Sequence, residues 1–136
     1  MILLAVVDDR NGMMFNNRRQ SQDRVMRERI CELSAGSRLW MNQYSYKLFI
    51  KSETPANIMV DDNFLALAGA DDLCFVENTD IHPYTDRIKK IILFKWNRAY
   101  PGDTFFPMDL GEWKLVYTEE FAGSSHEKIT VETYVR

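Results

Sequence analysis

The sequence has few cysteines, little net charge and no apolar run long enough to cross a membrane. The formal net charge is only −3, so no general attraction to nucleic acid or to an anionic membrane is expected. The apolar run at residues 1–7 ends at Asp8 and has no basic lead of the kind that signal peptides carry. The two cysteines, Cys31 and Cys74, lie far apart within apolar segments, which predicts reduced core thiols and a cytoplasmic protein.

Length and composition are those of one ordinary globular domain. The chain has 136 residues, of which 46% are hydrophobic and 27% are charged. That is enough to bury a core without metals or disulfide crosslinks. No internal repeat or low-complexity tract is present in the sequence. We therefore expect a single domain that spans residues 1–136.

Apolar runs and helical patterns alternate through the first two thirds of the chain. Apolar runs predict five strands, at residues 2–7, 38–41, 57–60, 73–76 and 90–96. Helical spacing predicts helices at residues 21–36, 44–50 and 61–69, and a short one at 80–88. Ser21 is the expected N-cap of the first helix, and Asp61 or Asp62 that of the third. The alternation predicts an α/β fold with a mostly parallel central sheet and helices on both faces.

The last third of the chain has the pattern of an antiparallel hairpin. Residues 113–121 and 128–135 alternate polar and apolar side chains on either side of a turn at residues 122–125. Loops are expected at residues 13–20 and 97–107. The sheet is therefore predicted to end in a C-terminal antiparallel hairpin at its edge.

Three segments of the sequence resemble a known family. They are AVVDDRNG at residues 5–12, LWM before a helix at residues 39–41, and a C-terminal block made of GDTFFP at 102–107, WKLV at 113–116 and SH at 125–126. Their order and spacing resemble dihydrofolate reductase. The resemblance implies the fold of that family, a ligand cleft at the carboxyl ends of the parallel strands, and NADPH-dependent reduction of a pterin as the family's activity.

The residues at the implied cofactor site depart from the family. After the second strand the family has Gly-Arg and then Thr for the cofactor phosphate, whereas this chain has Asn42, Gln43 and Ser45. After the fourth strand the family has a Gly-Gly pair, whereas this chain has Glu77 and Asn78. A carboxylate at that point repels a diphosphate. We therefore expect no cofactor, and a diverged family member that is a binding or regulatory protein for a small pterin-like or nucleotide-like ligand.

The resemblance also implies roles for residues near the start of the chain. Asp23 falls where the family keeps the acid that assists proton delivery to the pterin. The alternative is that Asp23 only stabilises the first turn of a helix, where acids are common. Ala5 and Val6, late in the first strand, belong to the implied ligand contacts.

Arg18 and Arg19 belong to the one basic concentration of the sequence. Their guanidinium groups predict contacts to an anionic ligand or to the phosphates of RNA. The alternative is a solvated charged surface, which is what most charge runs form. Because the chain as a whole is acidic, nucleic acid is the less favoured partner, and a small molecule is the expected one.

The sequence thus leaves three hypotheses of function. The first is the diverged ligand-binding or regulatory protein, the second an active NAD(P)H-dependent reductase with Asp23 assisting proton delivery, and the third an RNA-related protein using Arg18 and Arg19. A metal site is not expected, because neither histidine has other ligands at metal-binding spacing. Ser125 and His126 are neighbours in the chain, and neighbours in a strand point to opposite faces, so they predict no catalytic triad.

Overall fold

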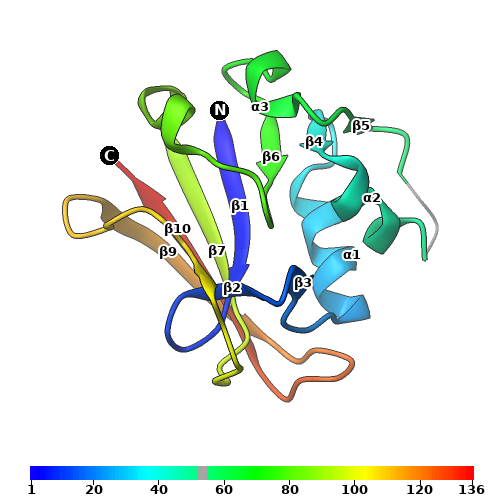
Figure 1. Cartoon of the computed structure of the whole chain (residues 1–136), viewed down its shortest axis with the longest axis vertical. Helices are drawn as coiled ribbons and strands as arrows, with labels where there is room; N and C mark the ends of the chain where they lie inside the picture. Colours follow the sequence, from blue (N-terminus) through cyan, green and yellow to red (C-terminus); the bar gives the residue numbers. More distant parts are fainter. Residues whose placement is uncertain (52–54) are drawn as a thin grey trace.

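A seven-stranded sheet forms the centre of the computed structural model, which describes residues 1–51 and 55–136. Its spatial order is β5 (Ile58–Val60), β4 (Leu39–Met41), β6 (Leu73–Phe75), β1 (Ile2–Val7), β7 (Lys90–Lys95), β10 (Ile129–Val135) and β9 (Lys114–Phe121). The first five strands are mutually parallel. β10 pairs antiparallel with both β7 and β9, so the C-terminal hairpin closes one edge, as the sequence predicts (Figure 1).

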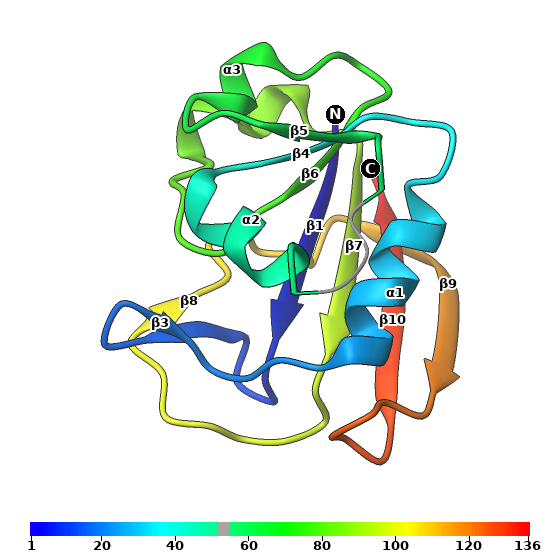
Figure 2. The same ribbon diagram turned by 90° about the vertical axis from the view of Figure 1, so that its right-hand side faces the viewer.

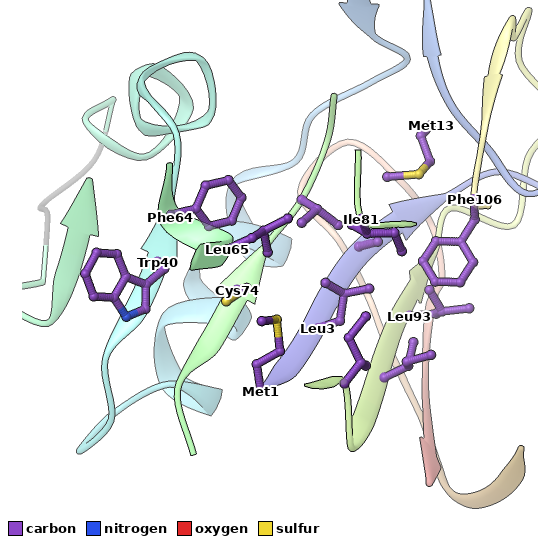
Figure 3. Close-up of a cluster of buried hydrophobic side chains, with 14 of the residues drawn as sticks. Met1, Leu3, Met13, Trp40, Phe64, Leu65, Cys74, Ile81, Leu93 and Phe106 are labelled. Carbon is purple, nitrogen blue, oxygen red and sulfur yellow. The ribbon is translucent and has the colours of Figure 1, made fainter. Parts of the chain in front are cut away.

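Side chains that alternate along the strands enter two separate cores. In β1, Leu3 and Ala5 belong to one core and Leu4 to the other. The second core is covered by α1 (Arg24–Leu33) and α2 (Gln43–Phe49), which lie in front of the sheet in Figure 2. The first core is covered by α3 (Phe64–Leu67) and the 3₁₀ helix η1 (His82–Arg87), and Figure 3 shows Phe64 and Leu65 of α3 beside Cys74 of β6. The continuous apolar runs therefore correctly predicted strands that are covered on both faces.

Two segments predicted as loops contain strands. β2 (Gly12–Phe15), β3 (Arg18–Arg19) and β8 (Thr104–Phe105) form a second sheet in the order β3-β2-β8. β2 and β3 are joined by Asn16 and Asn17, whose φ angles of 51° and 60° are both left-handed. Two such residues make the tight turn that suits a hairpin, and asparagine tolerates this conformation better than most residues. The Asn-Asn pair therefore indicates a hairpin, and the loop predicted at residues 13–20 was wrong in this respect.

The caps of two helices also differ from the prediction. Asp23, not Ser21, is the N-cap of α1, and its side chain accepts a hydrogen bond from the Met26 amide. α3 begins after Asn63, whose side chain makes no capping bond, and Asp61 instead accepts from the amide of Asn63 at 2.7 Å. Because Ser21 does not cap α1, its side chain can contact His126 in the C-terminal part of the chain.

The two cysteines are free thiols, and Cys74 is buried in the first core. Burial raises the pKa of the Cys74 thiol to about 12, which keeps it protonated and unreactive. Among the described residues, no helix has both the length and the apolar character that a membrane crossing requires.

Candidate functional site

The polar residues predicted after the second and fourth strands lie together at one edge of the sheet. β4 leads directly into α2 through Asn42, and β6 is followed by Val76, Glu77 and Asn78. β4 and β6 are parallel neighbours, so their carboxyl ends meet at the same edge. Ligands of open α/β sheets bind at this kind of edge.

Glu77 forms a two-point ion pair with Arg19. The Arg19 Nε donates to Glu77 Oε2 at 2.9 Å, and a terminal guanidinium nitrogen donates to Oε1 at 3.0 Å. The side chains are only 20% and 10% exposed, respectively. The guanidinium also lies 4.5 Å from the centre of the Tyr44 ring, and the Tyr44 hydroxyl accepts a hydrogen bond from the Arg19 amide. Arg19 is thus fixed against Glu77 and Tyr44 and does not project freely into solvent.

Glu77 is also bound to the first turn of α2. The Ser45 hydroxyl donates to Glu77 Oε1 at 2.8 Å. Asn42 caps the helix by accepting from the Ser45 amide, and its own amide nitrogen donates to Asn78 Oδ1 at 2.8 Å. One connected network therefore joins β3, the start of α2 and the segment after β6, with a carboxylate at its centre.

Glu77 lines two of the hollows at this edge. One is narrow, with about 10 Å³ of free space, and also contains Val6, Gln20 and Ser21 in its wall. The other has a volume of about 260 Å³ and is lined by residues that include Met13 and Asn78. Most of its surface is apolar. A third hollow of about 480 Å³ lies outside them and contains Arg18 in its wall. The Glu77 carboxylate is therefore reached from the wider of these two hollows.

Asp23 lies apart from this network, in a buried cluster at the start of α1. Its Oδ1 accepts from the amides of Met26 and Ser124, each at 3.0 Å. Its Oδ2 accepts from the Ser125 amide at 2.8 Å and lies 3.0 Å from His126 Nδ1. The Asp23 side chain is 0% exposed. The carboxylate therefore joins helix α1 to the turn of the C-terminal hairpin.

Hydrogen bonds decide the protonation state of Asp23. Burial alone raises the pKa of a carboxyl group, but the amides of Ser125 and Ser124 and the His126 ring outweigh it and hold the pKa of Asp23 well below its usual range. The hairpin turn can approach so closely because residue 123 is glycine: a Cβ there would overlap the Asp23 carboxylate and lie 3.0 Å from the His126 carbonyl oxygen.

Comparisons with known proteins decide the fold and leave the function open. No family model matches the sequence, and no curated protein matches it. Among solved structures, a dihydrofolate reductase from Enterococcus faecalis, complexed with NADP(H) and RAB-propyl, superposes with a TM-score of 0.69. The match covers 99% of this chain and 95% of that one, at 14% sequence identity. The chain has a dihydrofolate reductase-like fold.

Within this dihydrofolate reductase-like fold, most of the predicted site residues come together. The network contains five of them, namely Arg19, Asn42, Ser45, Glu77 and Asn78. Val6 lines the narrow hollow, whereas Ala5 is fully buried in the first core. Arg18 is exposed at the outer hollow, and Asp23 is enclosed in its own cluster.

Gln20 and Ser21, which line the narrow hollow, were not predicted as site residues from the sequence. Gln20 donates from its amide nitrogen to Asp8 Oδ2 and to the Pro101 carbonyl, both at 3.2 Å, while its Oε1 is buried without a hydrogen-bond partner. Ser21 contacts His126, which is 105 residues away in the chain. No local pattern could indicate either contact, because each partner is supplied by a different part of the fold.

Proposed function

We propose that this protein is a diverged member of the dihydrofolate reductase-like fold that binds or senses a small polar ligand without using a dinucleotide in the usual place. The observation that carries the proposal is the Glu77 carboxylate, which is bound by Ser45 of the first turn of α2 and by Arg19 of β3. Phosphate groups favour free backbone amides at helix starts and positive charge. A carboxylate fixed at this position repels phosphate groups. It also pairs with the Arg19 guanidinium, which could otherwise bind a phosphate.

The ligand class follows from what surrounds Glu77. The hollow beside it offers about 260 Å³, an apolar wall that includes Met13 and Phe105, and polar groups from Asn78 and Thr79. Such a site favours a flat or compact molecule with one apolar face and hydrogen-bonding edges. Pterin-like and nucleobase-like compounds have this character. We therefore propose a ligand of this class, bound by Glu77, Asn78 and the neighbouring apolar wall.

An NADPH titration tests the proposal. Trp96 lines the narrow hollow, so its fluorescence reports binding at this edge. We expect no saturable response of the wild-type protein at micromolar NADPH. Glu77→Gln should gain affinity by about tenfold, because it removes a like charge and releases Arg19. Glu120→Gln is the matched control, since Glu120 is an exposed residue of β9. Micromolar binding of NADPH to the wild type contradicts the proposal.

The competing hypothesis is an active reductase that uses Asp23. The enclosure of Asp23 by three backbone amides, the His126 ring and the Ser125 hydroxyl does not favour it, because no carboxylate oxygen is presented to a ligand. The reductase hypothesis requires NADPH oxidation that depends on an added pterin and is lost in Asp23→Asn. The RNA hypothesis is weakened in a similar way, since Arg19 is already paired with Glu77.

A further inference from the structure

A buried histidine joins three segments of the chain outside the Glu77 network. The His126 side chain is 2% exposed, and its ring stacks on Trp96 with 4.3 Å between centroids. Its Nδ1 lies 3.0 Å from Asp23 Oδ2. Its Nε2 lies 3.1 Å from the Ser21 hydroxyl and 2.9 Å from the Tyr100 hydroxyl.

The partners of His126 determine which ring nitrogen carries the proton. Asp23 is an ionised carboxylate and can only accept, so Nδ1 must be the donor. In the neutral ring Nε2 is then the acceptor, and its lone pair faces the hydroxyls of Ser21 and Tyr100. The ring is therefore held with its basic nitrogen directed at two hydroxyl groups.

We propose that Ser21 is a nucleophilic serine, activated by His126 and oriented through Asp23, that accepts small acyl groups from activated esters. The order of atoms is that of a Ser-His-Asp triad, with the carboxylate on Nδ1 and the hydroxyl on Nε2. Ser124 and Ser125 are the serines next to His126 in the sequence, whereas the serine that meets Nε2 precedes α1. Asp23 acts here as a positioning residue.

The reaction is one acyl transfer followed by hydrolysis. The Ser21 oxygen attacks the ester carbonyl carbon and forms a C–O bond while its proton passes to His126 Nε2. The bond to the leaving alcohol breaks, and the alcohol oxygen takes that proton from Nε2. Water then attacks the acyl-serine with the same proton transfers, which releases the carboxylic acid and restores Ser21. No oxidant or cofactor enters the balance.

The surroundings of Ser21 restrict the size of the acyl group. Ser21 is half-buried and lines the narrow hollow together with Val6 and Gln20. The free space of about 10 Å³ is close to the volume that one water needs. Acyl groups larger than acetyl are therefore excluded, and acetyl and methanesulfonyl are the smallest reactive probes of Ser21.

Covalent labelling followed by peptide mass spectrometry tests the proposal. The protein is treated with p-nitrophenyl acetate or methanesulfonyl fluoride, and we expect the added mass on Ser21. Ser125 is an internal control, because it is exposed and its hydroxyl does not face Nε2. The hydroxyl lies 3.0 Å from the Gln22 carbonyl oxygen, 3.2 Å from Asp23 Oδ2 and 3.3 Å from Nδ1, which itself donates to Asp23. Labelling of Ser125 in preference to Ser21 overturns the proposal. Ser37→Ala, at another partly exposed serine, should leave labelling of Ser21 unchanged.

Two variants test the role of His126. His126→Gln removes the base and should slow labelling of Ser21 by about 100-fold. Because His126 is buried and this variant can fail to fold, Tyr100→Phe provides an independent test. It removes the hydroxyl that competes for Nε2, so Ser21 should react several-fold faster, and a rate no higher than that of wild type contradicts the proposal. Neither NADPH nor a pterin is used, so the outcome is independent of the proposed function.

Discussion

Two carboxylates, those of Asp23 and Glu77, lie near helix starts and are held by different kinds of hydrogen-bond donor. Asp23 is held by three backbone amides and by the ring of His126, and its side chain is 0% exposed. Glu77 is held by side chains alone, those of Arg19 and Ser45, and is 10% exposed at the wall of two hollows. Backbone amides cannot move away without unfolding the turn, whereas a side chain can exchange one partner for another. Asp23 therefore serves the fold, and Glu77 is the carboxylate that a ligand can reach.

The largest effect that separates the two is expected on stability. Asp23→Ala removes the cap of α1, leaves two hairpin amides without an acceptor and leaves His126 without its charged partner. Breaking such a buried pair costs about 3–4 kcal/mol of unfolding free energy. Urea unfolding followed by fluorescence measures it. Glu28→Ala is the control, since Glu28 pairs with Arg24 on the exposed side of α1 and should cost under about 0.5 kcal/mol. A similar loss of unfolding free energy in Asp23→Ala and Glu28→Ala would contradict the structural role of Asp23.

The acid side of the stability profile should also depend on Asp23. Its pKa is lowered in the folded protein, so its contribution is fully present above the unfolded value of about 3.9 and is lost as pH falls below that value towards the folded pKa. Wild type should therefore lose stability more steeply than Asp23→Asn as the pH falls from about 5 to about 2. Asp8 and Asp72, whose pKa values are also lowered, are present in both proteins. Parallel profiles would show that Asp23 is not held as described.

The smallest effect on stability is expected at Glu77. Glu77→Gln keeps an acceptor for Ser45 and removes only the charge facing Arg19, which costs about 1 kcal/mol because the pair is partly exposed. Arg19→Met should lower the free energy of unfolding by a similar amount. The double variant should lose little more than either single variant, because each single variant already breaks the same ion pair. Urea unfolding of the three variants gives the coupling. A loss at Glu77 equal to that at Asp23 would mean that both carboxylates serve the fold.

The comparison also shows which parts of the site could be predicted. Asn42, Ser45, Glu77 and Asn78 follow strands that the sequence places in one parallel sheet, which predicts them at its carboxyl end. The structure adds that these two strands are neighbours. Their mutual hydrogen bonds follow from proximity. The pairing of Arg19 with Glu77 could not be predicted, because the position of β3 depends on its pairing with β2 through the turn at Asn16 and Asn17.

The sequence by itself determined the order of the strands and helices of the central sheet, because apolar runs and helical spacing reflect which faces must be buried, and this requirement is local. It also determined which polar residues follow the parallel strands. Only the tertiary structure decided that Asp23 is enclosed by the hairpin turn and that Ser21 meets His126 across 105 residues. Those contacts join segments that approach each other only after the sheet has formed, so no local pattern in the chain specifies them.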